Sequence, residues 1–291
     1  CLADVVVYVD EGSVKILKCP FKSDIGQVIT WFGPPNFTRY TIGTLVDPNL
    51  TFRDRLNVTG DTENREYNLQ ISDIKSRDEG TYRCGGISNG LSRTEIFNLI
   101  VTAQPTSGPL LKQIPNGQVV VGTTINLTCT VIGGKPIANI SWKCGEYFNK
   151  SDQSSTMVAL SSIQLNVSKS DNDKMCNCTA SHSLWTPAKT TYIHFDVAYA
   201  PITNPTIQAP SDGIITGTSV TLTCTVSGGN PLVTLTWDCA GIKSNNTAGS
   251  TASYDVTFSV DKSSNNKVCT CSATHPIMSY RPSVQHRLVV Y

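Results

Sequence analysis

The residues of this chain whose types and spacing could support chemistry are its eleven cysteines, spread over 291 positions. Thiolates ligate zinc, exchange with other thiols or pair as disulfides, and the segments WKC (142–144) and CNC (176–178) could be misread as halves of a metal site. Other ingredients of catalysis are missing from the sequence, which holds four histidines and no HExxH, GxSxG, GxGxxG or P-loop motif. We therefore predict that the chain is not an enzyme and needs no cofactor or metal.

The composition favours an extracellular protein. Charged residues make up 15% of the chain and the net charge is +1, so there is no basic footprint for nucleic acid or an anionic membrane. Regular cysteine spacing indicates an oxidising compartment, where disulfides persist. Asn-x-Ser/Thr sequons point the same way. The nine sequons are at Asn36, Asn49, Asn57, Asn126, Asn139, Asn149, Asn166, Asn177 and Asn245.

Three pairs of cysteines each bracket a tryptophan. The groups are Cys19, Trp31 and Cys84; Cys129, Trp142 and Cys178; and Cys224, Trp237 and Cys271. This pattern resembles the immunoglobulin superfamily, in which cysteines on strands B and F of facing sheets pair against a strand C tryptophan. The resemblance implies an all-β chain of three tandem immunoglobulin-like β-sandwiches. It also implies the disulfides Cys19–Cys84, Cys129–Cys178 and Cys224–Cys271.

The first group carries further marks of a variable-type domain. The segment DEGTYRC ends at Cys84 and resembles the strand F signature of such domains, with Tyr82 as the tyrosine of the corner. The resemblance also implies an ion pair between Arg55 and Asp78. The first cysteine pair is 65 residues apart, which leaves room for two extra strands, whereas separations of 49 and 47 fit the smaller constant-type sandwich.

Two proline-bearing stretches, 103–110 and 198–205, follow strand-like segments and divide the chain into domains at 1–102, 103–200 and 201–291. The second and third domains are an internal repeat, because TTINLTCTVIGGKPIANISWKC and TSVTLTCTVSGGNPLVTLTWDC align without a gap. We expect one V-type domain followed by two duplicated C2-like domains. Because the links are short, we expect the domains to form a semi-rigid, elongated rod.

Each repeat carries two more cysteines, Cys144 and Cys176 in one and Cys239 and Cys269 in the other. Side chains alternate along a strand. If the tryptophan lies opposite the strand F cysteine, as in the family, these cysteines oppose each other inside the core and can form Cys144–Cys176 and Cys239–Cys269. The second disulfide replaces the tyrosine corner, a departure from the usual family pattern. Added stability is the simple interpretation, and a redox or zinc role is the alternative.

Both repeats have a Gly-Gly-x-Pro loop, at 133–139 and 228–234, and apolar residues in the later loop between strands F and G. These apolar residues are Trp185 in one repeat and Ile277, Met278 and Tyr280 in the other. Such loops lie at the end that faces the preceding domain. We expect them to pack the junctions between domains, with coverage of their own domain's end as the alternative.

The V-type domain offers a candidate binding surface on the sheet of strands G, F, C and C′, called here the GFCC′ face. Its margins carry Asn36 and Asn49 and the opposite sheet carries Asn57, so we predict that no glycan covers its centre. Aromatic and arginine side chains are enriched in interface hot spots, and alternation from the core residues directs several outward. The candidates are Phe32, Tyr40, Arg83, Ile87, Ser88, Asn89 and Leu91. An ordinary solvated surface is the alternative.

The sequence thus predicts an extracellular recognition or adhesion receptor ectodomain. Its V-type domain would bind a protein ligand or a second copy of the chain, and the two C2-like domains would be glycosylated spacers with a second disulfide each. The alternative is a soluble innate-immune or scavenging protein, for example a fragment of a lectin-linked defence molecule. A sialic-acid receptor is disfavoured, because the arginine of that family follows the strand F cysteine whereas Arg83 precedes Cys84.

The two ends of the chain leave its full form open. No apolar run is long enough to cross a bilayer, and the chain stops at Tyr291 directly after a strand-like segment. We expect an ectodomain fragment or a truncated secreted protein. The residues Cys1, Leu2 and Ala3 resemble the end of a signal peptide; a free thiol or an interchain disulfide are the alternatives for Cys1.

Overall fold

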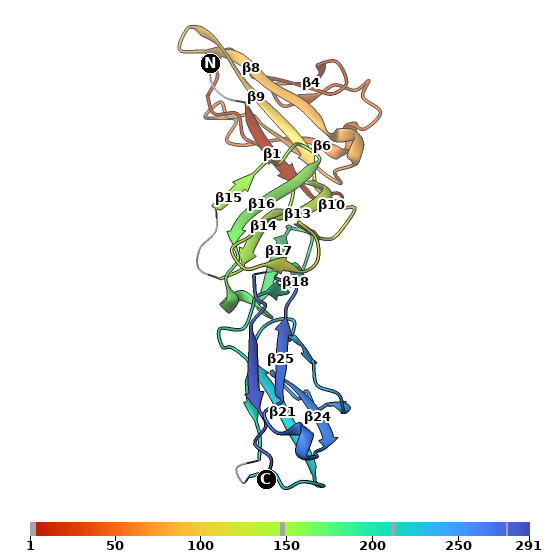
Figure 1. Cartoon of the computed structure of the whole chain (residues 1–291). Helices are drawn as coiled ribbons and strands as arrows, with labels where there is room; N and C mark the ends of the chain where they lie inside the picture. The colour runs from red at the N-terminus through yellow and green to blue at the C-terminus, as the bar shows by residue number, and fades with distance from the viewer. Residues whose placement is uncertain (1–3, 146–148, 211–212, 278) are drawn as a thin grey trace.

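The computed structural model describes residues 4–145, 149–210, 213–277 and 279–291, so Cys1 and Met278 lie outside the described residues. Three β-sandwiches follow one another along an elongated molecule, with the chain termini near opposite ends (Figure 1). Within these described ranges nearly all regular structure is strand, and the helices are four single turns of 3-10 helix. The predicted fold class, an all-β rod of tandem sandwiches, is confirmed.

The first sandwich has the strand set of a variable-type domain. Its larger sheet has the order β1-β9-β8-β3-β4-β5, formed by Val5–Val9, Leu91–Val101, Gly80–Ser88, Thr30–Gly33, Thr38–Ile42 and Leu45–Val46. The smaller sheet has the order β2-β7-β6, formed by Lys15–Leu17, Asn68–Ile71 and Leu56–Thr59. Single turns of 3-10 helix lie between β5 and β6 (η1, Arg53–Arg55) and between β7 and β8 (η2, Ser76–Asp78).

The core of this domain forms as the sequence predicts. Trp31 is fully buried and lies directly opposite Cys84 in the register of β3 and β8. The Tyr82 hydroxyl donates a hydrogen bond to the backbone carbonyl of Asp78 at 2.7 Å, which is the tyrosine corner. The predicted pair of Arg55 and Asp78 is present as a bidentate contact, with nitrogen to oxygen distances of 2.5 and 2.8 Å.

In the described part of the chain, the third sandwich has the four-plus-three strand plan of a constant-type domain, and the second has five strands in one sheet and three in the other. In the larger sheet of the second domain, β10 (Ala103–Pro105) and β11 (Leu110–Ile114) both pair with β13 (Thr124–Lys135), and β16 (Val158–Asn166) and β15 (Asn149–Asp152) follow. Its other sheet consists of β14 (Asn139–Lys143), β17 (Met175–Ser181) and β18 (Lys189–His194). A separate pair is formed by β12 (Val119–Val120) and β19 (Val197–Ala198). In the third, the sheets are β20 (Thr206–Gln208), β21 (Ser219–Ser227), β24 (Thr251–Ser259) and β23 (Ile242–Asn245), and β22 (Thr234–Trp237), β25 (Val268–Thr274) and β26 (Ser283–Arg287).

Two disulfides close each repeat in the structure. Trp142 lies opposite Cys178 and Trp237 opposite Cys271, the register on which the second pair depends. The pairs Cys129–Cys178 and Cys224–Cys271 join the two sheets, with Cα atoms 6.5 and 6.4 Å apart. Cys144–Cys176 and Cys239–Cys269 link neighbouring strands, with Cα atoms 4.2 and 5.4 Å apart. Together with Cys19–Cys84, these bridges occupy every cysteine in the described part of the chain.

The junctions between domains use the Gly-Gly-x-Pro loops. Lys135 of the first such loop forms an ion pair with Glu79 of the preceding domain at 2.6 Å. Asn230 of the second loop reaches the preceding domain through its backbone, which pairs with Tyr199, and through its side-chain amide. The prediction that these two loops pack the junctions is confirmed.

Trp185 does not serve a junction, and the expectation that it would is wrong. Its side chain is 7% exposed and packs with Cys129 and Cys178 in the core of its own domain. Tyr280 packs on the core of the third domain, and its hydroxyl also donates a hydrogen bond to the Thr203 carbonyl in the link between the second and third domains. These residues look exposed in sequence because they sit in a loop, but the loop folds back over the open end of the sandwich. His182 secures this fold-back by bonding the Pro136 carbonyl at 2.8 Å.

Candidate partner-binding face

The GFCC′ face is formed by β9, β8, β3 and β4 of the first domain. Trp31 and Cys84 oppose each other and point inward, so the next opposed pair, Phe32 and Arg83, points to solvent. Both side chains are half-buried by their neighbours. The sequence therefore placed these two candidates on the correct side of the sheet.

Arg83 lies against two aromatic rings. Its guanidinium carbon is 4.6 Å from the ring centroid of Phe32 and 5.4 Å from that of Phe37. Phe37 belongs to the turn between β3 and β4 and is 49% exposed. Each cation–π contact at an exposed site contributes about 0.5–1 kcal/mol, so the arginine is held in place before any partner arrives. Alternation along strands could not reveal Phe37, because it lies in a turn.

Tyr40 is a correction to the sequence prediction, because it points into the core and is 2% exposed. A bulge between Trp31 and Phe32 shifts the register of β4, so that Phe32 faces Arg39. The Tyr40 hydroxyl donates a hydrogen bond to the Pro34 carbonyl, and burial followed by the charge of Asp78 raises its pKa to about 12. Arg39 takes the outward position instead.

The hairpin between β8 and β9 carries the remaining candidates. Ile87, Asn89 and Leu91 are exposed. Ser88 is a second correction, because it is 6% exposed. It is four residues after Cys84 and therefore shares the inward side of the strand, a signal that the sequence already contained.

Asp24, which sequence reasoning missed, fixes the tip of this hairpin. Its carboxylate accepts hydrogen bonds from the backbone N–H groups of Asn89 at 2.7 Å and Gly90 at 2.8 Å. Its own N–H donates to the Ile87 carbonyl at 2.9 Å. The segment before β3 and the hairpin after β8 therefore form one surface at the free end of the domain.

Gly85 lies at the middle of the face and contributes no side chain there. This residue has the outward parity of Arg83 and lies between Thr30 and Thr94 in the register. A Cβ atom added there would meet only the Thr94 hydroxyl at 3.6 Å and the Arg93 carbonyl at 3.7 Å. A side chain at this position would therefore fit without a clash, and apolar Ile42, 42% exposed, lies beyond Thr30 on β4.

The sequons of this domain lie away from the centre of the face. Asn57 is exposed on β6 in the opposite sheet, and Asn49 is exposed in the turn after β5. Asn36 is exposed beside Phe37, at the margin of the group formed by Arg83, Phe32 and Phe37, called here the arginine cluster. In the other domains Asn126, Asn139, Asn166 and Asn245 are exposed and Asn177 is half-buried, while the side chain of Asn149 lies outside the described residues.

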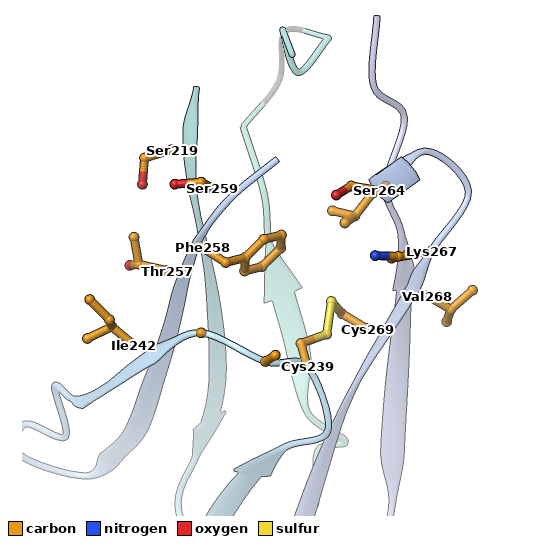
Figure 2. Close-up of a pocket in the computed structure, with 13 residues that line it drawn as sticks. Ser219, Cys239, Ile242, Thr257, Phe258, Ser259, Ser264, Lys267, Val268 and Cys269 are labelled. Atoms are coloured by element: carbon orange, nitrogen blue, oxygen red, sulfur yellow. A yellow bond between two sulfur atoms is a disulfide. The ribbon is translucent and has the colours of Figure 1, made fainter. Parts of the chain in front are cut away.

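A separate hollow lies in the third domain, away from this face. It encloses about 670 Å³ in the third domain, where Cys239, Cys269, Ile242, Phe258 and Lys267 line it (Figure 2). Among the described residues, no three histidine, cysteine or acidic side chains are grouped so that they could hold a metal ion. No helix among all the residues that the structure describes is long and apolar enough to cross a membrane.

Two protein families match the first and second domains of this chain. The immunoglobulin V-set domain family matches residues 3–102, and the CD80-like C2-set immunoglobulin domain family matches residues 109–186. Among curated proteins, cell adhesion molecule 4 of Xenopus laevis is 27% identical over 231 residues, or 77% of this chain and 56% of that protein. Cell adhesion molecule 2 of Homo sapiens is 26% identical over 237 residues, or 78% and 52%.

The chain therefore spans about half the length of the curated relatives it matches. Among solved structures, a three-domain I-band fragment of titin covers 99% of this chain and 96% of its own length, with a TM-score of 0.54 and 15% identity. At that identity, the likeness supports the fold alone.

Proposed function

Because the chain belongs to the immunoglobulin superfamily, with a V-type domain followed by C2-type domains, we propose that it is an adhesion ectodomain that binds a protein partner through its GFCC′ face. The observation that carries the proposal is the arginine cluster, in which Arg83 lies over Phe32 and Phe37 on a face whose central strands hold no sequon. The names of the relatives, which are cell adhesion molecules, support the adhesive role.

The face has the features of an interface that is formed in advance. A guanidinium between two rings presents a flat, partly desolvated surface with little side-chain entropy left to lose. Gly85 leaves the backbone at the centre of the face uncovered by a side chain of its own, and exposed Ile42, Leu45 and Ile87 supply apolar area around it. Such a centre, surrounded by polar residues, is the usual arrangement of a protein–protein hot spot.

The second and third domains act in this proposal as spacers on the outside of a cell. Sequons lie on both sheets of the second domain, at Asn126 and Asn166 on one and Asn139 and Asn177 on the other. Glycans on both faces leave little bare protein for a partner. The spacers hold the V-type domain away from whatever carries the chain.

Bead aggregation tests the proposal with purified chain. Beads coated with the chain are mixed with one another, and with cells, to separate binding to a second copy from binding to a different protein. We expect Phe32→Ala and Arg83→Ala each to weaken binding by about 1–3 kcal/mol. Gly85→Glu should abolish it, because a Cβ at this position fits without a clash inside the domain and the added carboxylate would project from the centre of the face.

Ile16→Ala is the matched control, since Ile16 is an exposed aliphatic residue on β2 of the opposite sheet, 41% exposed. It should bind like the unaltered chain. Full binding by all three face variants, in domains that remain folded, would show that the partner site lies elsewhere. Absence of any binding to cells or to itself, with a soluble carbohydrate ligand found instead, would favour the defence molecule.

A further inference from the structure

A second surface stands out on the middle domain, on the outer face of β14, β17 and β18. Tyr192 is 61% exposed and Met175 is 47% exposed, and exposed His194 lies two residues from Tyr192 on the same strand. The Tyr192 and His194 rings are in T-shaped contact with centroids 5.6 Å apart. We call Tyr192, His194 and Met175 the Tyr192 platform. Large exposed aromatic and apolar groups that lie together usually meet another molecule.

Asn177 lies directly beside this platform. In the register of β17 and β18, Asn177 is opposite Tyr192 and Met175 is opposite His194. Opposed side chains on one face have Cβ atoms about 4.5–5.5 Å apart. The cysteines on either side of Asn177 are fully buried, so Asn177 must point outward with the platform. Asn177, Cys178 and Thr179 form a sequon.

The asparagine side chain is not committed to the protein. Its carbonyl oxygen is buried and has no hydrogen-bond partner among the described residues. On its other side β14 places Lys143 opposite it, a long exposed cation. A group attached to the Asn177 amide therefore has a charged neighbour on one side and an aromatic neighbour on the other.

We propose that an N-linked glycan on Asn177 lies across the Tyr192 platform and is held there as part of the folded domain. A pyranose ring has an apolar face of C–H groups and a rim of hydroxyls, so it can stack on tyrosine while its rim stays hydrated. β18 is the last strand of its sheet, so the same sugars would cover that edge. The glycan that would cover the platform is covalently attached to the same domain. This explains why a spacer domain without a protein partner can carry a tyrosine that the polypeptide itself leaves exposed.

Asn139 provides an internal comparison on the same face. It lies opposite Ser181 at the far end of β14 and β17, where the register offers a small polar residue in place of an aromatic one. The glycan on Asn139 should therefore project freely into solvent. The two sites share a sheet, a secretory history and an enzyme environment, and they differ in the neighbour.

Hydroxyl-radical footprinting of the full chain, secreted from mammalian cells, tests the contact. We expect Tyr192 and Met175 to be oxidised severalfold more slowly in the glycosylated protein than after complete removal of the glycans by peptide N-glycosidase. Trimming to a single N-acetylglucosamine should retain part of the protection. Tyr8 and Met157, exposed by 45% and 71% and outside this face, should react equally in all forms. Equal oxidation of Tyr192 in all forms, or an unoccupied Asn177, would overturn the proposal.

Site-specific glycan composition gives a second, independent measurement. A glycan held against the protein is a poor substrate for processing enzymes, so Asn177 should carry less processed sugars than Asn139. Tyr192→Ala should move the Asn177 composition toward that of Asn139 and leave Asn139 unchanged. Thr179→Ser, which keeps the sequon, is the control. If Asn177 and Asn139 carry the same processed glycans before the substitution, the sugar is not held and the proposal fails.

Discussion

The ion pair of Arg55 and Asp78 is the most enclosed charge pair of the V-type domain, with side chains 14% and 8% exposed. Asp78 also accepts a hydrogen bond from the Lys75 N–H at 2.8 Å. Burial by itself would raise the pKa of the Asp78 carboxyl, but the Arg55 hydrogen bonds and charge outweigh it, so that pKa lies below its usual range. The pair joins the entry of β6 to the turn before β8, and Tyr82 closes the same corner.

We predict that Asp78→Asn destabilises the V-type domain by about 3 kcal/mol, because it leaves the Arg55 charge buried without its partner. Urea unfolding, followed by hydrogen exchange of the β8 amides, measures the change in that domain alone. Exposed Asp54→Asn, on the neighbouring turn, should leave the stability within about 0.5 kcal/mol of the unaltered chain. Equal stability of the two variants would show that the pair contributes nothing.

The same pair sets an acid limit. Since the pKa of Asp78 is lower in the folded state than in the unfolded state, its contribution is complete above the unfolded value of about 3.9 and is lost as the pH falls through the folded value. Unfolding of the V-type domain below about pH 4 should therefore be steeper in the unaltered chain than in Asp78→Asn. Parallel pH curves for the two proteins would contradict this.

At the scale of residues, the sequence predicted partners well where a motif defines them and poorly where geometry decides. Tyr82, Arg55 and Asp78 follow from one signature segment. Tyr40 does not, because strict alternation fails at a bulge whose position depends on how β3 and β4 pack. Asp24 was missed because its role requires two loops, far apart in the chain, to meet.

Among elements, the hairpin of β8 and β9 depends on that loop contact. Asn89 and Gly90 have positive φ angles of 52° and 70°, as a tight two-residue turn requires, and Asp24 holds both N–H groups. Because the hairpin borders the GFCC′ face, its order affects any partner that touches Ile87 or Leu91.

We predict that Asp24→Ala speeds hydrogen exchange at Asn89 and Gly90, since hydrogen bonds to a charged acceptor contribute about 1.5–3 kcal/mol each at most. Exchange in the centre of β8 should stay unchanged, and partner binding should weaken through faster dissociation. Asp24→Asn keeps one acceptor oxygen, so its exchange rates at Asn89 and Gly90 should lie between those of Asp24→Ala and those of the unaltered chain. Unchanged exchange at Asn89 and Gly90 would contradict an anchoring role for Asp24.

The second disulfides of the repeats are elements of a different kind, because each lies within the loop that the first already closes. Cys239–Cys269 spans 30 residues inside the 47 of Cys224–Cys271. Chain entropy gives at most about 3.5 kcal/mol for a loop of that length, and less here because the chain is already constrained. We predict that Cys239→Ala with Cys269→Ala lowers the stability of the third domain by less than Cys224→Ala with Cys271→Ala does.

Peptide mapping under non-reducing conditions tests the pairing itself. It should recover Cys129 with Cys178 and Cys144 with Cys176, and the equivalent pairs in the third domain. A linked peptide of Cys129 with Cys144 would overturn this pairing. Calorimetry of the two double variants measures the stability difference predicted above, and that comparison is meaningful only if the pairing is correct.

For the whole molecule, the two junctions differ in kind. The first depends on Lys135 and Glu79, whose side chains are 48% and 35% exposed, and a pair so exposed contributes about 0–1 kcal/mol. At the second, the Asn230 amide nitrogen lies 3.1 Å from the Asn172 side-chain oxygen and 2.9 Å from both Asp196 Oδ1 and the Val197 carbonyl, so its two N–H groups are shared among three acceptors. We infer that the second and third domains move as a more nearly rigid unit than the first and second.

We predict that Asn230→Ala widens the distribution of angles between the second and third domains, because it removes these bonds and leaves only the backbone pairing with Tyr199. Small-angle scattering on the full chain measures this as a shorter maximum dimension and a broader profile. Lys135→Ala should instead act at the first junction and mimic high salt, which screens exposed ion pairs. Scattering profiles that match for Asn230→Ala and the unaltered chain would show that the Asn230 side chain does not hold the second and third domains together.

The division into three sandwiches, the V-type character of the first and the duplication of the other two could all be predicted, because each rests on short patterns that the fold demands. The junctions could be predicted only in part. Their loops were visible as repeated Gly-Gly-x-Pro segments, but the acceptors of Asn230 come from two separate segments of another domain, at Asn172 and at Asp196 with Val197. Trp185 was misplaced for the same reason, since burial of a loop residue depends on where the loop folds.

The nesting of the disulfides also decides how the molecule behaves under tension. When a chain is pulled from its ends, a covalent bridge removes the residues it encloses from the length that can unravel, at up to about 3.3–3.6 Å for each. Cys129–Cys178 and Cys224–Cys271 already withhold 49 and 47 residues of the two spacers. Cutting Cys144–Cys176 or Cys239–Cys269 would therefore release no additional length. Pulling on the two ends cannot load these inner bridges until the outer bridges have been reduced.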